Sequence, residues 1–343
     1  YTDALIADIN YESGLVTDRT VTSIFFGGGT PSLFSGEAVE RILSSAAEYF
    51  SICDDCEITL EANPGTAEAT HFKAYRNAGI NRLSIGMQSF NNGQLRLLGR
   101  IHKAEESMLA YQLARDAGFD NINIDLMYGL PEQNLEQGHY DLQQALLLKP
   151  EHLSWYQLTI EANTRFAHEP PELPDEDVID TLYLSGVELL HDAGYDRYEV
   201  SAYARPGHES RHNMNYWQFG DYLGLGAGAH GKLTRNDEIK RYSRYKHPSD
   251  YMLRAGSMKV YELYNPVNED ELVLEYLLNQ LRLIQGFDLQ HAHKAMGTDP
   301  DELISRLSAP LSQGLLEINH GNCRATDRGM RYLNEIFLGL MPP

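Results

Sequence analysis

Three consecutive glycines, Gly27, Gly28 and Gly29, stand directly after a short apolar run at residues 22–26. A glycine has no Cβ, so its backbone N–H and C=O groups can approach a ligand closely. Glycine at the end of a strand also loses entropy on ordering and adds no packing. The run therefore predicts either a binding site made of bare backbone or a tight turn, and other parts of the chain must decide between the two.

Polar residues occupy the same position relative to four further apolar runs. Glu61, Gln88, Asp125 and Gln157 each stand at or near the end of such a run. Each one alone could cap the following helix or be a hydrogen-bonded core residue. If the runs are parallel strands, their carboxyl ends share one rim, where such folds build their sites. Five such features on one rim favour a binding site over coincidence.

The elements that would position these residues alternate along the first 200 residues. Runs typical of strands lie at 22–26, 57–61, 82–86, 121–127, 152–158 and 198–201. Helical patterns separate them at 36–50, 68–78, 105–117, 135–147 and 175–193. Strands that alternate with helices predict repeated βα units in a parallel sheet or barrel.

The rhythm changes after residue 232. A helical pattern at 268–284 is followed by a helix at 302–311, a short strand at 314–318, a turn and a terminal helix, which is a winged-helix-like outline. The basic, tyrosine-rich segment 241–246 fits a solvated surface better than an anion site. We therefore expect two domains, at 1–232 and 233–343.

Composition limits the class of partner. The 343 residues are 42% hydrophobic and carry a formal net charge of −21, a field that repels phosphate backbones, so we expect no nucleic acid partner. No apolar run approaches the roughly 20 residues that span a bilayer, so we expect no stable membrane insertion. Three cysteines do not suggest a disulfide scaffold, and a reducing cytoplasm fits them best.

One histidine stands beside aromatic residues. His212 is followed by Asn213, Tyr216 and Trp217. An imidazole can ligate heme iron, and flat aromatic rings can contact the macrocycle. A hydrogen-bonded core cluster of the same residues is the alternative, and the residues alone leave both readings open.

The same motifs carry a family resemblance. Segments 27–31, 61–64, 84–90 and 125–131 resemble the radical S-adenosylmethionine (SAM) family of oxygen-independent coproporphyrinogen III oxidase-like proteins. Within it, the segment 212–217, His-Asn-Met-Asn-Tyr-Trp, is similar to the His-Asn-x-x-Tyr-Trp signature of the HemW-type heme chaperones. The resemblance covers essentially the whole chain.

The resemblance implies a fold and a set of ligands. The fold is α/β, a partial (βα)6 barrel without its first strand and cluster loop, with a small α+β, winged-helix-like cover domain at the C-terminus. The resemblance also implies which residues bind each ligand. SAM would be bound by Gly28, Gly29, Thr30, Glu61, Gln88, Arg100, Asp125 and His230. Heme would be bound by His212, Tyr216 and Trp217.

The family also holds a [4Fe-4S] cluster on three cysteines, spaced Cys-x3-Cys-x2-Cys before the glycine run. No cysteine precedes Gly27 in this chain, so we expect the cluster ligands upstream of Tyr1. Cys53 and Cys56 have the wrong spacing and position, and we interpret them as structural or surface cysteines. A degenerate relative without a cluster is the alternative to a cluster loop outside these residues.

Three functions compete. The first is a heme chaperone that binds SAM, a [4Fe-4S] cluster and heme, and delivers heme to an acceptor hemoprotein. This acceptor could be a membrane-bound protein. The second is an oxygen-independent coproporphyrinogen III oxidase, which decarboxylates propionates through an adenosyl radical. The third, an unrelated TIM-barrel enzyme, requires four motifs to coincide. The segment 212–217 favours the chaperone, and no catalytic residue is assigned.

Overall fold

A curled seven-stranded sheet is the frame of the molecule. The computed structural model describes residues 1–16, 18–65, 69–235 and 238–341. The strand order is β1-β2-β3-β4-β5-β7-β6, and the first five strands are parallel. Their bounds are Thr20–Phe26 (β1), Ser51–Ala62 (β2), Arg82–Gln88 (β3), Ile122–Tyr128 (β4), His152–Gln157 (β5), Asp196–Glu199 (β6) and Ala202–Ala204 (β7). The predicted α/β partial barrel is confirmed.

The last part of the sheet differs in detail from the prediction of a sixth parallel strand at 198–201. Those residues lie in an antiparallel hairpin, in which β7 pairs with both β5 and β6. Only two residues separate β6 from β7, whereas a parallel connection needs a crossover of a dozen or more. The short connection therefore enforces the antiparallel pairing.

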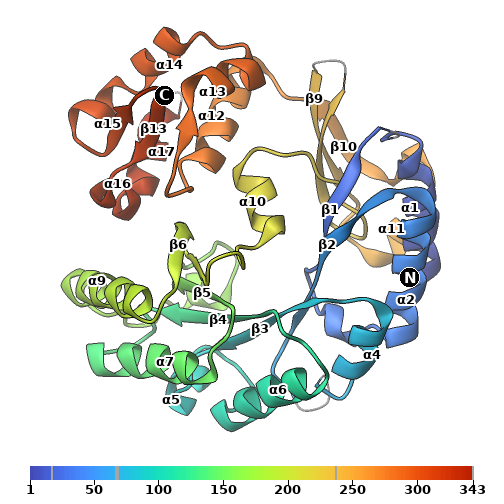
Figure 1. Ribbon diagram of the computed structural model, residues 1–343, viewed down its shortest axis with the longest axis horizontal. Coiled ribbons are helices and arrows are strands. Elements are labelled where there is room, and N and C mark those ends of the chain that lie inside the picture. Colours follow the sequence, from blue (N-terminus) through green and yellow to red (C-terminus); the bar gives the residue numbers. More distant parts are fainter. Residues whose placement is uncertain (17, 66–68, 236–237, 342–343) are drawn as a thin grey trace.

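Helices cover the outer side of the arc, as Figure 1 shows. Their bounds, with one 3-10 turn, are Thr2–Ser13 (α1), Pro31–Leu33 (η1), Gly36–Tyr49 (α2), Phe72–Ala78 (α4), Asn92–Leu97 (α5), Ala104–Asp116 (α6), Leu135–Leu148 (α7), Arg165–His168 (α8) and Glu176–Asp192 (α9). Alternate strand residues such as Leu83, Ile85 and Ile124 pack under these helices and are fully buried. The main core therefore lies between the sheet and the helices, which leaves the inner face free for other side chains.

Strand β2 is longer than the predicted run at 57–61. Ile52 pairs with Val21 and Glu57 pairs with Ser23, so residues 53–56 form a bulge that β1 does not match. Cys53 and Cys56 lie at the two ends of this bulge, within the strand rather than before it.

A second, three-stranded sheet packs against α1. Its elements and their neighbours are His230–Arg235 (β8), Glu238–Arg244 (β9), Pro248–Arg254 (α11), Met258–Val260 (η2) and Tyr261–Pro266 (β10). The strand order is β10-β9-β8, with antiparallel pairing throughout. Arg244 of β9 is fully buried and its guanidinium contacts Glu12 of α1 at 2.5 Å. This ion pair joins the second sheet to the start of the chain.

The C-terminal region forms a separate small core of helices and short strands. Its elements are Glu269–Gln280 (α12), Phe287–Asp288 (β11), Leu289–Met296 (α13), Pro300–Arg306 (α14), Ser308–Ser312 (α15), Leu316–Asn319 (β12), Asn322–Ala325 (β13), Asp327–Arg331 (α16) and Leu333–Leu340 (α17). The predicted helix at 268–284 and the strand at 314–318 correspond to α12 and β12, and the predicted helix at 302–311 is divided into α14 and α15. Helix α13 and strands β11 and β13 were not predicted. The domain boundary expected after residue 232 stays a prediction.

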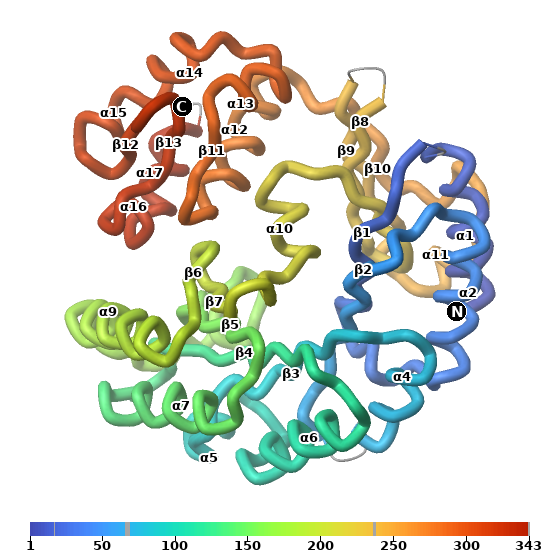
Figure 2. The backbone as a smooth tube through the Cα atoms, in the orientation of Figure 1, coloured from blue at the N-terminus to red at the C-terminus, as the bar shows by residue number. Residues whose placement is uncertain are grey.

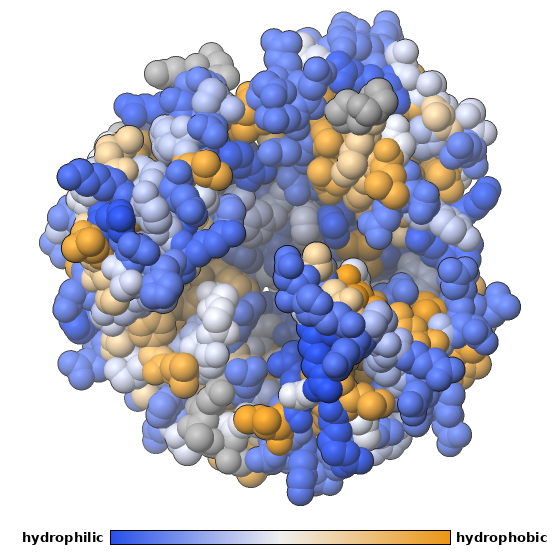
Figure 3. All heavy atoms as spheres, turned by 180° about the vertical axis from the view of Figure 1, so that it is seen from behind, coloured by the Kyte–Doolittle hydropathy of each residue, from blue (hydrophilic) through white to orange (hydrophobic). Residues whose placement is uncertain are grey.

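Helix α10, Arg211–Trp217, lies in the middle of the molecule. Figures 1 and 2 show the other elements arranged around it as a ring. It contacts β1 on one side and α12 on the other. Seen from behind, the molecule is largely hydrophilic and is hollowed near its centre (Figure 3). The short helix that carries the predicted heme motif is thus enclosed by the rest of the chain.

Candidate functional site

The inner face of the curled sheet is polar. On β4, Asn123 and Asp125 alternate with the buried apolar residues. Ser84 of β3 donates to Asp125 Oδ2 at 3.1 Å, and the Asn123 amide donates to Asp125 Oδ1 at 2.7 Å. His152 and Ser154 of β5 contact Asn123 Oδ1 at 2.6 and 3.1 Å. Hydrogen bonds across three strands thus hold Asp125 in one orientation inside the arc.

The glycine run faces Glu61 across the rim. The Gly28 N–H donates to Glu61 Oε2 at 3.2 Å. Gly28 and Gly29 have φ angles of +76° and +61°, and no atom lies within 4 Å of where a Cβ would stand on either. A Cβ on Gly27 would come within 2.4 Å of the Phe25 ring. The turn therefore requires glycine, and it also leaves open space beside its backbone; the binding site made of bare backbone stays a prediction.

Gln88 ends β3 in a strained conformation. Its φ is +69°, which is uncommon for a residue with a side chain, and it is almost fully buried. Tyr156 of β5 donates from its hydroxyl to Gln88 Oε1 at 2.9 Å. Arg100 is exposed, and its positive charge acts on the Tyr156 hydroxyl. Strain of this kind persists where the surroundings fix it, as they do at binding sites.

Two carboxylates dominate the electrostatics of this rim. Burial raises the pKa of Glu61, and the neighbouring Asp125 raises it further, while the Gly28 N–H lowers it. Burial also raises the pKa of Asp125, against hydrogen bonds from Asn123, Ser154 and Ser84 that lower it. A cationic or hydroxyl-bearing ligand would relieve this cost. The structure therefore brings Gly28, Glu61, Gln88 and Asp125 to one end of the sheet, with Thr30 beginning η1 next to them.

Four residues that support this site were not among those predicted to bind SAM. Tyr156, Ser84, Asn123 and Ser154 hold Gln88 and Asp125 in place. Their signal is period-two alternation, with polar residues at every second position of runs that are otherwise apolar. Gln157, in contrast, is exposed at the end of β5, where its side chain packs on Gly129.

His212 lies inside the ring, against β1. Its imidazole stacks on Phe25 with ring centroids 4.2 Å apart, and Tyr216 meets it edge-on at 4.7 Å. Burial, with a smaller contribution from the Arg82 charge, lowers the pKa of His212 to about 4. The ring is therefore neutral at physiological pH, which is the form that ligates metals.

A carboxylate of β2 holds the start of α10. Glu57 accepts from the backbone N–H groups of Arg211 and His212, both at 3.2 Å, and from the Ser210 hydroxyl at 3.4 Å. Arg82 lies 3.9 Å from the same carboxylate, and both side chains are nearly fully buried. A negative charge at a helix N-terminus satisfies unpaired N–H groups and complements the helix dipole. Glu57 thereby fixes where His212 sits.

Tyr216 and Trp217 of α10 also contact residues outside the curled sheet. Tyr216 lies 4.3 Å from the ring of Tyr222, and the Arg282 guanidinium of the α12 end lies 5.0 Å from the Trp217 ring. The buried Trp217 indole N–H has no hydrogen-bond partner among the described residues. Other buried polar groups of the described residues, such as the Tyr276 hydroxyl, also have none, so this donor is available to a ligand but does not by itself indicate one.

His230 lies apart from these residues. It is exposed at the first position of β8, in the second sheet rather than on the rim of the curled sheet. Its predicted role in SAM binding therefore stays a prediction.

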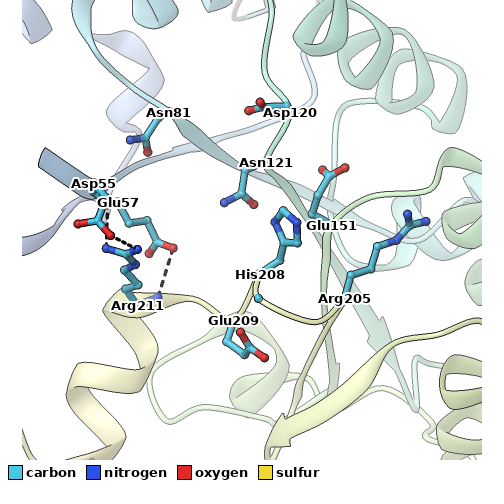
Figure 4. Close-up of a pocket in the computed structure, with 11 residues that line it drawn as sticks. Asp55, Glu57, Asn81, Asp120, Asn121, Glu151, Arg205, His208, Glu209 and Arg211 are labelled. Atoms are coloured by element: carbon cyan, nitrogen blue, oxygen red, sulfur yellow. Dashed lines mark hydrogen bonds and ion pairs between the residues drawn. The ribbon is translucent and has the colours of Figure 1, made fainter.

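A cavity of about 500 Å³ opens at the amino ends of the strands, opposite the glycine rim. Figure 4 shows its lining, in which Asn121 and Glu151 precede β4 and β5 and His208 and Arg205 face them. On its other side Asp55 and Glu57 reach across to Arg211 at the start of α10. This cavity was not predicted, because its residues come from β2, from the start of α10 and from several loops, which no local motif brings together.

The described residues hold no group of three or more His, Cys, Asp or Glu side chains that could bind a metal ion. Cys53, Cys56 and Cys323 are free thiols, and Cys323 belongs to the separate C-terminal core. The three cysteines thus do not fit a [4Fe-4S] cluster. In the part of the chain that the structure describes, no helix is both long and apolar enough to cross a membrane.

A curled parallel sheet with glycine, glutamate and glutamine features on its carboxyl rim defines a radical SAM-type fold. Residues 6–145 match the Radical SAM superfamily, and residues 267–332 match the HemN C-terminal domain. The structure is similar to coproporphyrinogen III oxidase (HemN) from Escherichia coli, a radical SAM enzyme, with a TM-score of 0.82 and 22% identity over 99% of this chain and 82% of that one. That likeness shows the fold.

Sequence relatives define the family more narrowly. The chain is 45% identical to the heme chaperone HemW of Haemophilus influenzae over 97% of this chain and 86% of the relative. It is 42% identical to the heme chaperone HemW of Escherichia coli, over 98% and 89% of the two chains. The chain belongs to the HemW family.

Proposed function

We propose that this protein is a heme chaperone that binds SAM at the glycine rim, accepts heme on helix α10 and delivers it to an acceptor hemoprotein in the cytoplasm. The observation that carries the proposal is His212. Its ring is kept neutral by burial, and neither ring nitrogen is hydrogen-bonded within the part of the chain that the structure describes. A neutral imidazole with a free nitrogen can coordinate heme iron without first losing a proton.

The aromatic neighbours support the same role. Tyr216 and Trp217 present flat rings beside His212, and the unpaired Trp217 N–H offers a donor to a propionate or another acceptor. Phe25 stacks on one face of the imidazole and Tyr216 meets it edge-on, so a macrocycle that approaches a ring nitrogen needs room, which a movement of α10 away from β1 would give. The strength with which α10 is held then governs how readily heme is accepted.

The rim residues fit SAM by their chemistry. The ammonium and sulfonium of SAM would relieve the raised pKa values of Glu61 and Asp125. Arg100, with Gln88, suits the carboxylate, and the open side of Gly28, Gly29 and Thr30 admits the ligand's amino-acid end. The family also implies a [4Fe-4S] cluster, but the described residues offer no ligand set for it, so no step of the proposal depends on it.

A heme titration tests the proposal. Heme added to the purified protein should give a Soret band of a ligated iron, and His212→Ala should weaken binding at least tenfold. His191→Ala, on the exposed face of α9, is the matched control and should bind as the unaltered protein does. An unchanged Soret band in the His212→Ala protein would remove the proposed ligand.

A second assay separates the chaperone from the oxidase. Anaerobic incubation of the protein with SAM, a reductant and coproporphyrinogen III should give no protoporphyrinogen. Product at catalytic rates would establish the oxidase instead.

A further inference from the structure

Two cysteines mark the ends of the β2 bulge. Cys53 and Cys56 are separated by two aspartates, and β1 pairs with neither of them. Cys53 is partly exposed, whereas Cys56 is buried. Val21 and Ser23 are two positions apart, whereas their partners Ile52 and Glu57 are five positions apart, so the backbone of the bulge must curl, which brings Cys53 and Cys56 toward each other. An unpaired bulge can change shape without breaking the ladder on either side of it.

A chain of polar contacts joins this pair to α10. Arg211 and, to a smaller extent, the neighbouring Cys53 thiol lower the pKa of the Asp55 carboxyl group to about 2. Arg211, the first residue of α10, donates to Asp55 Oδ2 at 2.6 Å and to the Asp55 carbonyl oxygen at 2.8 Å. Figure 4 shows Asp55 and Arg211 facing each other at the edge of the cavity. The bulge therefore helps Glu57 to fix the start of the helix.

We propose that Cys53 and Cys56 form a reversible intramolecular disulfide, and that its formation loosens the hold of the bulge on helix α10. The disulfide site rests on the register of the bulge. Its consequence for heme rests on the proposed function.

The oxidant in this thiol–disulfide exchange is a low-molecular-weight disulfide. The Cys53 thiolate attacks one sulfur of the oxidant, and the first thiolate leaves. The Cys56 thiolate then attacks Cys53 Sγ, breaks the mixed disulfide and releases the second thiolate. Two electrons pass from the protein to the oxidant, and the two thiol protons end on the two released thiolates. Oxidation removes the Cys53 S–H beside Asp55, and the new S–S bond draws the two ends of the bulge together, which moves Asp55 relative to Arg211.

The reaction is slow at neutral pH because the thiolate is scarce. Burial raises the pKa of Cys53, and it raises the pKa of Cys56 to about 12. In a reducing compartment the pair therefore rests as a dithiol and responds to sustained oxidation rather than to brief fluctuations.

Mass spectrometry after thiol trapping tests the disulfide. The full chain is incubated with oxidised glutathione, alkylated, and digested. We expect a peptide that contains residues 53–56 to lose two hydrogens, while Cys323, which is fully buried, stays a free thiol as an internal reference. Cys53→Ser and Cys56→Ser should each abolish that species. Only glutathione adducts, only intermolecular disulfides or only free thiols would overturn the proposal.

Hydrogen exchange tests the coupling to α10. In the oxidised protein the amides of Met214 to Trp217 should exchange several-fold faster than in the reduced protein. In the Cys56→Ser protein these amides should exchange at the same rate under oxidising and reducing conditions. In the Asp55→Asn protein they should exchange fast under both. A disulfide that forms with unchanged α10 exchange would overturn the coupling.

Heme titration of the oxidised and reduced protein separates this proposal from the chaperone proposal. We expect heme to associate several-fold faster with the oxidised form, a difference that Cys56→Ser abolishes. If neither form binds heme, the chaperone proposal fails while the disulfide and the exchange result still stand. Equal heme association by both forms, with the disulfide present, would overturn the functional consequence.

Discussion

Single residues define the chemistry at the glycine rim. Glu61 faces the Gly28 N–H and carries a raised pKa, because burial and the Asp125 charge both disfavour its ionised form. A carboxylate in that state gains more from a cationic ligand than an exposed one does. The rim therefore contains a defined point at which ligand binding and protonation compete.

Replacing Glu61 with Gln should weaken SAM binding tenfold or more. The reason is the loss of a charge-assisted hydrogen bond, which contributes roughly 1.5–3 kcal/mol. Equilibrium dialysis with SAM measures the effect, and Glu40→Gln on the exposed face of α2 is the control. Equal affinity in the two variants would remove Glu61 from the site.

The same residue should make SAM binding depend on pH. Protonated Glu61 cannot attract an ammonium, so affinity should fall as pH decreases through its pKa, which lies above that of an ordinary glutamate. The fall should begin at a higher pH than an ordinary glutamate would give, and Glu61→Gln should flatten it. A profile of the same shape in both proteins would contradict this assignment.

At the scale of elements, the sequence predicts the frame better than the supports. Helices and strands up to β5 follow from apolar periodicity, and the glycine and glutamate motifs follow from their position after strands. The support of α10 by Glu57 joins residues more than 150 positions apart, and no local pattern records such a contact. The hairpin of β6 and β7 was missed because its turn residues carry no glycine or proline signal.

Helix α10 should depend on Glu57 for its stability. It has only seven residues, too few for a helix to persist without tertiary contacts. Glu57→Gln removes the charge that Arg82 pairs with in a nearly fully buried position, and such a loss costs about 3–5 kcal/mol. Denaturant unfolding measures the change, with the exposed Glu48→Gln as control.

The control should stay within about 0.5 kcal/mol of the unaltered protein. In the Glu57→Gln protein the α10 amides should also exchange faster. A variant as stable as the control would show that the carboxylate neither holds the helix nor balances Arg82.

At the scale of the whole molecule, buried contacts join the first helix, α1, to the second sheet. Arg244 of β9 contacts Glu12 at 2.5 Å and Asp8 at 3.4 Å, and all three side chains are fully buried. Tyr251 donates to Asp8 at 2.9 Å, and Tyr261 donates to Glu12 at 2.5 Å. A sequence cannot reveal a cluster like this one, because the carboxylates of α1 lie more than 230 positions from the residues that contact them. The cluster ties α1 to the second sheet, beside the strand that begins the curled sheet.

Removing Arg244 should destabilise the protein in a way that depends on pH. Burial raises the pKa of Asp8 to about 6, although Arg244 opposes that rise. A carboxyl group with a raised folded pKa stabilises the fold below its unfolded pKa, and that contribution is lost as pH rises through about 6. Without Arg244 the pKa of Asp8 rises further, so the penalty of ionising it grows.

We therefore expect Arg244→Met to cost about 3–5 kcal/mol near pH 7 and clearly less near pH 5, where Asp8 takes up a proton. Denaturant unfolding at the two pH values measures the difference. Arg254→Met, which breaks a partly exposed pair with Asp250, is the matched control and should cost less than about 1 kcal/mol at both. A loss for Arg244→Met that is equal at both pH values would mean that the cluster joins α1 to the second sheet by packing alone, without the charge that the structure places there.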